Sequence, residues 1–209
     1  EFTMMELYQA FGDYSEVMDI TEELIRTAAM DCLGTTLVDI NGTECDLADP
    51  WPRHRMIDLV SRATGVEVHP SMPLAKLAAL AEEHGSKVER HWTAGKLIDE
   101  LFEATVEQSL IRPTFVTGHP VDISPLARRD RNDPSLTERF ELFVGARELA
   151  NGYSELNDPR EQRMRFEEEQ ASKEQGNLEA GTVDEDYLRD RKSTRLNSSH
   201  GYISYAVFC

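Results

Sequence analysis

Apolar residues along this chain follow two spacings, and each spacing predicts a kind of element. A recurrence every three or four positions predicts helices with one buried face, which we expect at about residues 13–31, 56–62, 74–84, 94–109 and 158–180. Alternation with polar residues, or a short apolar run, predicts strands, which we expect at about residues 1–10, 113–117 and 136–156, with a hairpin over 35–48. This mixture indicates an α+β fold.

Turn and cap residues sharpen these boundaries. Asn41-Gly42 is the expected turn of the hairpin, and Gly145 separates two strands within 136–156. Thr93 is an expected N-cap, and the helix that follows it turns inward Leu97, Ile98, Leu101, Phe102 and Val106. The first helix carries an apolar stripe made of Val17, Ile20, Leu24 and Ile25. The last helix is dense in charge, and we expect it to face solvent on most sides.

Three polar residues interrupt the apolar character of the last strand. Asn151, Tyr153 and Glu155 sit at i, i+2 and i+4, so on an extended chain they share one face. An amide, a phenol and a carboxylate are costly to bury without partners. The face is either the floor of a polar pocket for a small cationic ligand or the wet side of an edge strand, and the spacing leaves both open.

The first strand carries a similar signal. Glu6 and Tyr8 share one strand face among apolar neighbours. Two strands that each bear a Glu and a Tyr are able to close one site around an ammonium group, because such a group needs oxygen acceptors on several sides.

Two further carboxylates flank the expected turn at Gly145. Glu141 and Glu148 are seven positions apart, and a hairpin at 144–147 brings them together across neighbouring strands. Paired carboxylates repel unless they share a proton or a cation, and Mg²⁺ is the natural cation beside nucleotide phosphates. The alternative is two solvated strand-end glutamates. Glu148 and Asn151 have opposite strand parity, so both face one pocket only if a bulge falls near 149–152, where Gly152 permits one.

Composition and charge narrow the class of protein. The chain has 209 residues, 40% of them hydrophobic, which is enough for one domain with a core. Its net charge of −17 repels polyanions unless basic residues cluster locally. We find no apolar run of the roughly 20 residues that a membrane span needs. Cys32, Cys45 and Cys209 are too few and too scattered for a disulfide framework or a zinc site.

The remaining candidates for chemistry are weaker. The six histidines have no metal-ligand spacing, and we expect them at the surface or with satisfied partners. Arg128, Arg129 and Arg131 form a local basic cluster that either approaches a phosphate or belongs to a solvated loop, and the loop is the simpler interpretation.

The amino-acid sequences of three segments resemble a known protein family. Glu1-Phe-Thr-Met-Met-Glu-Leu-Tyr8 is similar to the second half of motif 2 of the class II aminoacyl-tRNA synthetases. Ser124-Pro-Leu-Ala-Arg128 and Asn151-Gly-Tyr-Ser-Glu-Leu-Asn-Asp-Pro159 resemble the lysyl branch of that family. The resemblance covers about residues 1–188 and implies a class II catalytic domain, an antiparallel sheet flanked by helices.

That resemblance implies a reaction and a set of roles. The reaction is ATP-dependent activation of lysine to lysyl-adenylate, followed by transfer to tRNA(Lys), with no covalent nucleophile from the protein. The resemblance also implies a cytoplasmic homodimer with no membrane partner. The implied lysine-binding residues are Glu6, Tyr8, Asn151, Tyr153 and Glu155. The implied ATP-binding residues are Phe2, which stacks on adenine, with Glu141 and Glu148, which hold Mg²⁺.

Parts of the family pattern have no counterpart here. The strand with the first phosphate-binding Arg would precede Glu1, and the Gly-rich motif 3 would follow Tyr187. Residues 189–209 resemble no part of a synthetase and look like an adaptor-derived peptide. We therefore expect 1–188 to be a partial catalytic domain, 189–209 to be a non-native or disordered tail, and the chain alone to be inactive.

Two other functions remain open at this point. Synthetase-like domains also transfer lysine to lipid or to protein and share much of this pocket. A third possibility is a non-catalytic paralogue that binds lysine or a nucleotide.

Overall fold

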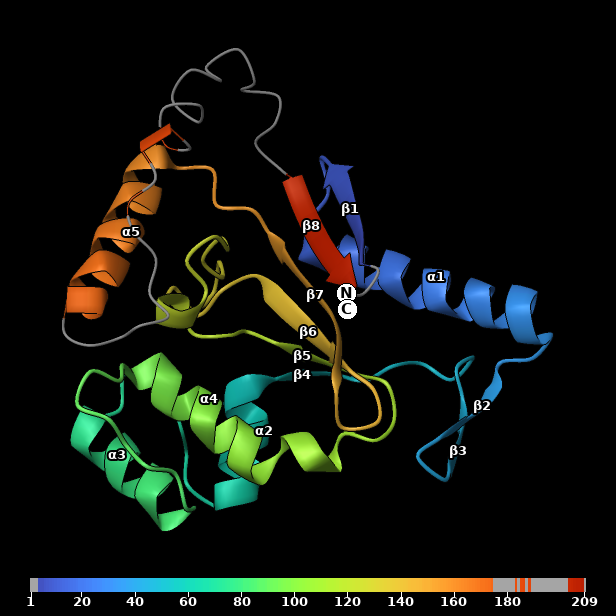
Figure 1. Ribbon diagram of the computed structural model, residues 1–209, viewed down its shortest axis with the longest axis horizontal. Coiled ribbons are helices and arrows are strands. Elements are labelled where there is room, and N and C mark those ends of the chain that lie inside the picture. The colour runs from blue at the N-terminus through green and yellow to red at the C-terminus, as the bar shows by residue number, and fades with distance from the viewer. Residues whose placement is uncertain (1–3, 175–182, 184, 187, 189–202, 209) are drawn as a thin grey trace.

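A large sheet with helices packed on both faces dominates the computed structural model, which describes residues 4–174, 183, 185–186, 188 and 203–208 (Figure 1). The helices are α1 Tyr14–Leu33, α2 Met56–Thr64, α3 Leu74–Glu83, α4 Ala94–Thr105 and α5 Pro159–Glu174, with 3-10 turns η1 Glu107–Ser109 and η2 Val121–Ile123. The strands are β1 Met5–Ala10, β2 Leu37–Ile40, β3 Thr43–Asp46, β4 Arg53–Arg55, β5 Thr114–Thr117, β6 Arg139–Phe143, β7 Glu148–Ser154 and β8 Ile203–Phe208.

The expected α+β elements are present, with few departures. The hairpin is β2–β3, and the two strands around Gly145 are β6 and β7. The short strand β4 was not anticipated, and the expected helix over 158–180 is described only as far as Glu174. Residues 1–3, which include Phe2, lie outside the described residues.

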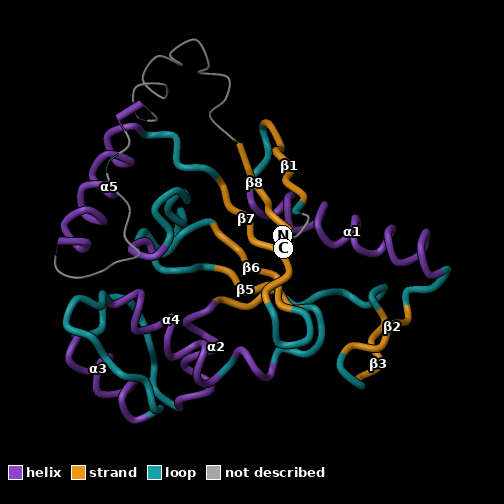
Figure 2. The backbone as a smooth tube through the Cα atoms, in the orientation of Figure 1, coloured by secondary structure: helices purple, strands orange, loops and turns teal. Residues whose placement is uncertain are grey.

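The main sheet has six strands in the order β1-β8-β7-β6-β5-β4 (Figure 2). Neighbours are antiparallel except β4 and β5, which run parallel. The expected α+β fold with an antiparallel sheet is confirmed, and the sheet is mixed only at this edge. The chain passes from β4 through α2, α3 and α4 before it returns as β5, and a parallel pair requires a crossover of this kind.

Alternate residues of the central strands enter two separate cores. Phe115 of β5 packs with Phe140 and Leu142 of β6 on the side covered by α1. The next residue, Val116, joins the core formed with α2, α3 and α4. Because successive strand residues point to opposite faces, β5 is apolar on both sides and is buried throughout its first three residues.

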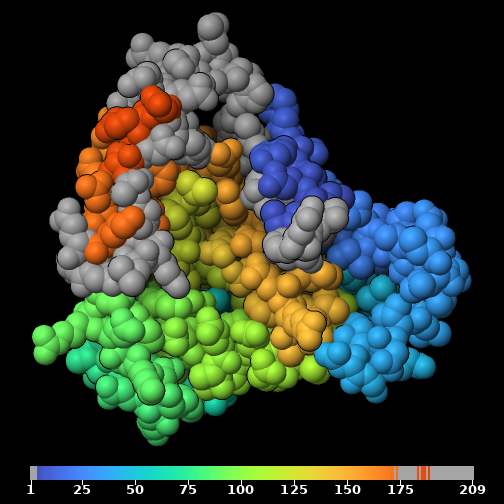
Figure 3. All heavy atoms as spheres, viewed as in Figure 1, coloured from blue at the N-terminus to red at the C-terminus, as the bar shows by residue number. Residues whose placement is uncertain are grey.

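Helix α1 is rotated relative to the expected stripe. Asp13 caps its start and Gly34 ends it in the left-handed region, as expected for helix ends. Its buried residues are Val17, Met18, Thr21 and Ala29. Leu24 is 38% exposed. The helix has apolar residues on two faces. The face that meets β6 and β7 includes Thr21. The Thr21 hydroxyl donates to the Val17 carbonyl oxygen at 2.7 Å. Figure 3 shows the far end of α1 projecting from the body of the molecule beside the hairpin.

Helix α5 is less solvated than its charge predicted. Arg165 is buried, and its guanidinium donates to the carbonyl oxygens of Ser124 at 3.0 Å and Ala127 at 2.6 Å. It also pairs with Glu161 at 2.6 Å. The long side chain thus ties α5 to the loop after η2, while Glu167 and Glu168 remain exposed as expected.

The two predicted turns form and touch each other. Asn41 and Gly42 both have positive φ, 53° and 81°, the geometry of a tight hairpin turn. Gly145 also has a positive φ of 63°, and a Cβ there would lie 2.9 Å from Ile40 Cγ2. The Asn41 side-chain amide donates to the Gly145 carbonyl at 3.0 Å, which joins the small hairpin to the β6–β7 turn.

The tail at 189–209 is described only in its strand β8. This strand pairs with β1 on one side and β7 on the other, so β1 meets the rest of the sheet through it. Residues 189–202 and Cys209 lie outside the described residues. The backbone pairing concerns six residues, and the assignment of 189–209 as foreign to the domain stays a prediction.

Replacing a buried leucine of α4 tests the core that carries the site. Leu101 is 0% exposed, and Leu101→Ala is expected to lower the free energy of unfolding by about 2–5 kcal/mol through lost burial and a cavity. Leu33→Ala removes the same atoms at a position that is 63% exposed, and its effect should stay within about 0.5 kcal/mol. Urea denaturation of both variants checks this, and equal losses would contradict the packing described.

Candidate functional site

A bulge in β7 determines which side chains share a face. Glu141 pairs with Asn151 and Leu142 pairs with Ala150, but Phe143 pairs with Glu148, so Leu149 is the extra residue. The inserted residue reverses the parity of Glu148 relative to Asn151. The bulge expected near 149–152 is confirmed, although it falls at Leu149 and does not use Gly152.

The expected site residues occupy two rows on one face of the sheet. Directly opposed residues in antiparallel strands point to the same side. The first row runs from Glu6 through backbone position 207 of β8 to Asn151 and Glu141. The second runs from Tyr8 through position 205 to Tyr153 and Arg139. Two strand spacings separate Glu6 from Asn151, or about 10 Å, with β8 between them.

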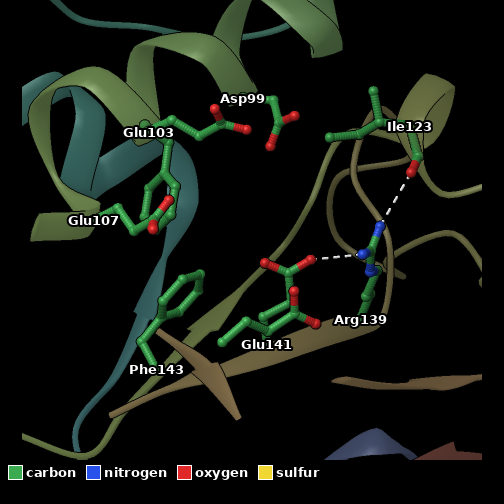
Figure 4. Close-up of a pocket in the computed structure, with 9 residues that line it drawn as sticks. Asp99, Glu103, Glu107, Ile123, Arg139, Glu141 and Phe143 are labelled. Atoms are coloured by element: carbon green, nitrogen blue, oxygen red, sulfur yellow. Dashed lines mark hydrogen bonds and ion pairs between the residues drawn. The ribbon is translucent and has the colours of Figure 1, made fainter. Parts of the chain in front are cut away.

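A cavity of about 260 Å³ opens on this face beside α4. Five carboxylates and one guanidinium line it with three apolar residues: Asp99, Glu103, Glu107, Glu141, Glu148, Arg139, Phe102, Ile123 and Phe143 (Figure 4). The sequence identified Glu141 and Glu148 but not the carboxylates of α4 and η1 or Arg139. The four-residue spacing of Asp99, Glu103 and Glu107 puts them on one side of a helix, and that spacing is a signal that sequence reasoning had available.

Both oxygens of Glu141 have cationic or polar neighbours. Arg139 Nη2 lies 2.6 Å from Oε1, and His119 Nε2 lies 3.3 Å from Oε2. Burial disfavours the charged form, but the neighbouring His119 and Arg139 outweigh it and lower the pKa of Glu141 to about 2. Arg139 also donates to the Ile123 carbonyl and the Ser124 hydroxyl, both at 3.0 Å, so it fastens η2 to the floor of the cavity (Figure 4).

Glu148 has the opposite electrostatic environment. It is exposed and lines the cavity, which places it at the rim. Desolvation by the cavity wall, followed by repulsion from Glu141, raises the pKa of Glu148 to about 7. A side-chain hydrogen bond with Asn151 and the charge of Arg139 only partly offset this. The two neighbouring carboxylates therefore have pKa values that lie far apart, because Arg139 and His119 stabilise the charge of Glu141, which in turn repels that of Glu148.

The α4 side of the cavity adds to the negative charge. Desolvation and the nearby Asp99 raise the pKa of Glu103. Desolvation and Glu141 raise the pKa of Glu107. These carboxylates and the Glu141–Glu148 pair face one small space, so the cavity favours cations.

Four of the expected lysine-binding residues, Glu6, Tyr8, Asn151 and Tyr153, lie on the face of the sheet that carries the cavity, and none of the five lines it. The Tyr8 hydroxyl donates to Glu6 Oε2 at 3.2 Å, and Tyr8 is 63% exposed. Asn151 Oδ1 is buried and has no hydrogen-bond partner within the described part of the chain. Tyr153 is partly buried in the same row as Tyr8, and Glu155 is partly buried where it bridges to Ala127 beyond the end of β7.

The oxygen donors of Glu141 and Glu148 fit a magnesium site. Mg²⁺ is commonly held by one or two carboxylates together with phosphate oxygens and water. Across the described ranges, no three His, Cys, Asp or Glu side chains form a ready-made metal cage. A metal ion that also binds a nucleotide needs only one or two carboxylates from the protein. Glu141 and Glu148 would supply them, and the cation would relieve their repulsion.

The other candidate residues, the basic cluster and the histidines, lie mostly in contacts that stabilise the fold. Arg129 pairs with Glu161 at 2.6 Å, and Arg131 pairs with Glu138 at 2.9 Å, in agreement with a loop role for the basic cluster. Among the histidines that the structure describes, His119 is the exception, because it is buried next to a candidate ligand. No helix in the described ranges is both long enough and apolar enough to span a bilayer.

Known proteins resemble this chain over most of its length. A family model described as "tRNA synthetases class II (D, K and N)" matches residues 1–198. A protein named Lysine--tRNA ligase from Staphylococcus aureus (strain MRSA252) is 47% identical over 188 residues, which are 90% of this chain and 38% of that protein. The Lysine--tRNA ligase of Staphylococcus haemolyticus (strain JCSC1435) is 46% identical over the same shares of both chains. The chain thus spans 38% of the length of these relatives.

Neutralising Glu148 tests the electrostatics of the cavity. Because its pKa is raised to about 7, the folded state binds a proton more tightly than the unfolded state does. The shift therefore costs stability that builds up as the pH rises from the ordinary glutamate value of about 4.3 to about 7, and most of that cost is gone at pH 5. Glu148→Gln is expected to raise the urea midpoint at pH 8 and to have little effect at pH 5. Glu82→Gln, on the exposed side of α3, controls for loss of one surface charge. A Glu148→Gln effect that does not change with pH would contradict the shift.

Proposed function

This chain belongs to the class II tRNA synthetases (D, K and N), and on that premise we propose that it forms the lysine- and ATP-binding part of a lysine–tRNA ligase. The observation that carries the proposal is that Glu6 and Tyr8 of β1, Asn151 and Tyr153 of β7, and the acidic cavity beside α4 all lie on one face of the sheet. In the proposed reaction the lysine carboxylate attacks the α-phosphate of ATP and releases pyrophosphate, and the lysyl group of the resulting lysyl-adenylate is then transferred to tRNA(Lys) with release of AMP.

The ammonium end of lysine suits the Glu/Tyr rows. A strongly hydrated ammonium needs acceptors on several sides to replace its water. Glu6 and Tyr8 on β1 and Glu155 at the end of β7 supply such acceptors. In this proposal Glu155 and Tyr8 lie nearest the ε-ammonium, Asn151 binds the lysine carboxylate, and Tyr153 lines the site between them. A neutral side chain would leave a carboxylate desolvated without a partner, and this gives selectivity for lysine.

The acidic cavity suits the metal-bound triphosphate. Glu141 and Glu148 would hold Mg²⁺, which when bound neutralises charge on the ATP phosphates. Arg139 keeps Glu141 oriented and ionised, so the ligand is available at neutral pH. Phe2 stacks on adenine in this proposal. The chain's contribution to catalysis is orientation and charge stabilisation, with no nucleophile of its own.

Several properties belong to the whole enzyme. We propose a homodimer that acts in the cytoplasm. We also propose that most of its tRNA contacts lie outside this segment, because this chain is strongly acidic, with a net charge of −17. Lysine-dependent ATP–pyrophosphate exchange by the full-length enzyme tests the activity itself. Exchange that depends on a different amino acid, or none at all, would overturn the proposal.

Glu155→Gln in the full-length enzyme should separate lysine binding from ATP binding. The change removes a charge opposite the ε-ammonium, worth roughly 1.5–3 kcal/mol, or on the order of 10- to 100-fold in lysine affinity. ATP affinity should hardly change, because the phosphates bind elsewhere. Equilibrium dialysis with each ligand measures the two constants, and Glu167→Gln on α5 serves as the matched control. Equal losses for both ligands, or no loss, would refute the role of Glu155.

Glu141→Ala and Glu148→Ala should each raise the Mg²⁺ concentration at half-maximal exchange. Each change removes one oxygen ligand, and an effect on the order of 10-fold or more is expected. Glu100→Ala is the control, because Glu100 lies on α4 outside the cavity lining and pairs with Lys96 at 3.0 Å. Unchanged Mg²⁺ titrations in both test variants would exclude this pair as ligands.

A further inference from the structure

His119 is buried directly beside the acidic cavity and has no role in the proposal so far. It is 1% exposed, and its Nε2 lies 3.3 Å from Glu141 Oε2. Both ring nitrogens are buried, and neither makes a hydrogen bond of good geometry among the described residues. A buried polar atom without a partner costs free energy, so the approach of Nε2 to Glu141 Oε2 at 3.3 Å is the polar contact that favours this orientation of the ring.

The backbone around His119 is held firmly. Its carbonyl accepts two hydrogen bonds from Thr137, one from the backbone N–H at 2.9 Å and one from the hydroxyl at 2.8 Å. Gly118 before it has a φ of +66° and donates to the Arg139 carbonyl at 3.2 Å. The imidazole is therefore presented from the end of β5 to its neighbour β6, where Glu141 is located.

Glu141 is thus held from two sides by groups on different segments. Arg139 fixes Oε1 from within β6, and His119 approaches Oε2 from the loop after β5. A carboxylate oxygen accepts more than one interaction, so each oxygen keeps acceptor capacity toward the cavity. Without His119, one oxygen loses its neighbour and the carboxylate is free to rotate about its last bond.

We propose that His119 is a positioning residue that orients Glu141 for the metal–ATP complex. It acts through Glu141 and does not itself contact the nucleotide. This inference rests on the proposed function, since it assigns His119 to the same metal site. Groups that orient metal-binding carboxylates typically change metal affinity by about 10- to 100-fold when removed.

Two amide substitutions separate orientation from packing. Gln places its side-chain N–H near the position of the histidine Nε2, whereas the shorter Asn does not reach that far. His119→Asn should weaken Mn²⁺ binding in the presence of ATP by about 10-fold, and His119→Gln should stay close to the unmodified chain. His69→Asn is the matched control, because His69 pairs with Asp133 at 2.9 Å away from the cavity lining.

Electron paramagnetic resonance of free Mn²⁺, titrated with the full-length enzyme and ATP, measures these affinities. Melting temperatures of the two His119 variants show whether both are folded to the same extent. Weakening in His119→Asn with recovery in His119→Gln supports the inference. Wild-type affinity in His119→Asn, or equal weakening in both variants, overturns it. Glu141→Gln distinguishes the two levels: if it leaves Mn²⁺ binding unchanged, the proposed metal role fails and the inference fails with it.

Discussion

The register shift between β6 and β7 is the constraint on which the rest of the site depends. One extra residue, Leu149, places Glu148 on the same side of the sheet as Asn151 and Glu141. Without it, Glu148 would point into the core beneath α1, where an ionised carboxylate is costly. The bulge lies next to the turn at Gly145, which contacts the small hairpin through Asn41. A local backbone irregularity thus converts an ordinary strand pair into two rows of polar side chains.

This arrangement brings several negative charges close together, and their repulsion costs free energy. Five carboxylates line one small cavity, and the only cationic group lining it within the described chain is Arg139. Glu141 stays ionised because His119 and Arg139 lie against it, while Glu148 takes up a proton near neutral pH. A cation bound between these carboxylates would relieve their mutual repulsion. This is the physical reason why a metal–nucleotide complex suits the site, and it links the stability of the fold to the occupancy of the site.

Local sequence patterns predict much of the structure, whereas the rest depends on contacts between residues that are distant in sequence. The α4 stripe, the Asn41-Gly42 turn and the need for a bulge followed from spacing alone. The buried stripe of α1 did not, because it is rotated toward Met18, Thr21 and Ala29 and leaves Leu24 38% exposed, and only contact with β6 and β7 decides this rotation. His119 and Arg165 were overlooked for a similar reason. Their partners, Glu141 and the carbonyls of Ser124 and Ala127, are distant in sequence or unmarked by residue type.

The coupling of Glu141 and Glu148 across the shifted register is the central claim, and carbon-13 NMR of the glutamate carboxyl groups tests it most directly. In the apo chain, Glu148 should titrate with a midpoint of about 7. In Glu141→Gln the midpoint should fall but remain above the ordinary value of about 4.3, because desolvation persists when the neighbouring charge is removed. A Glu148 midpoint near the ordinary value in both proteins would show that the two carboxylates do not share this cavity.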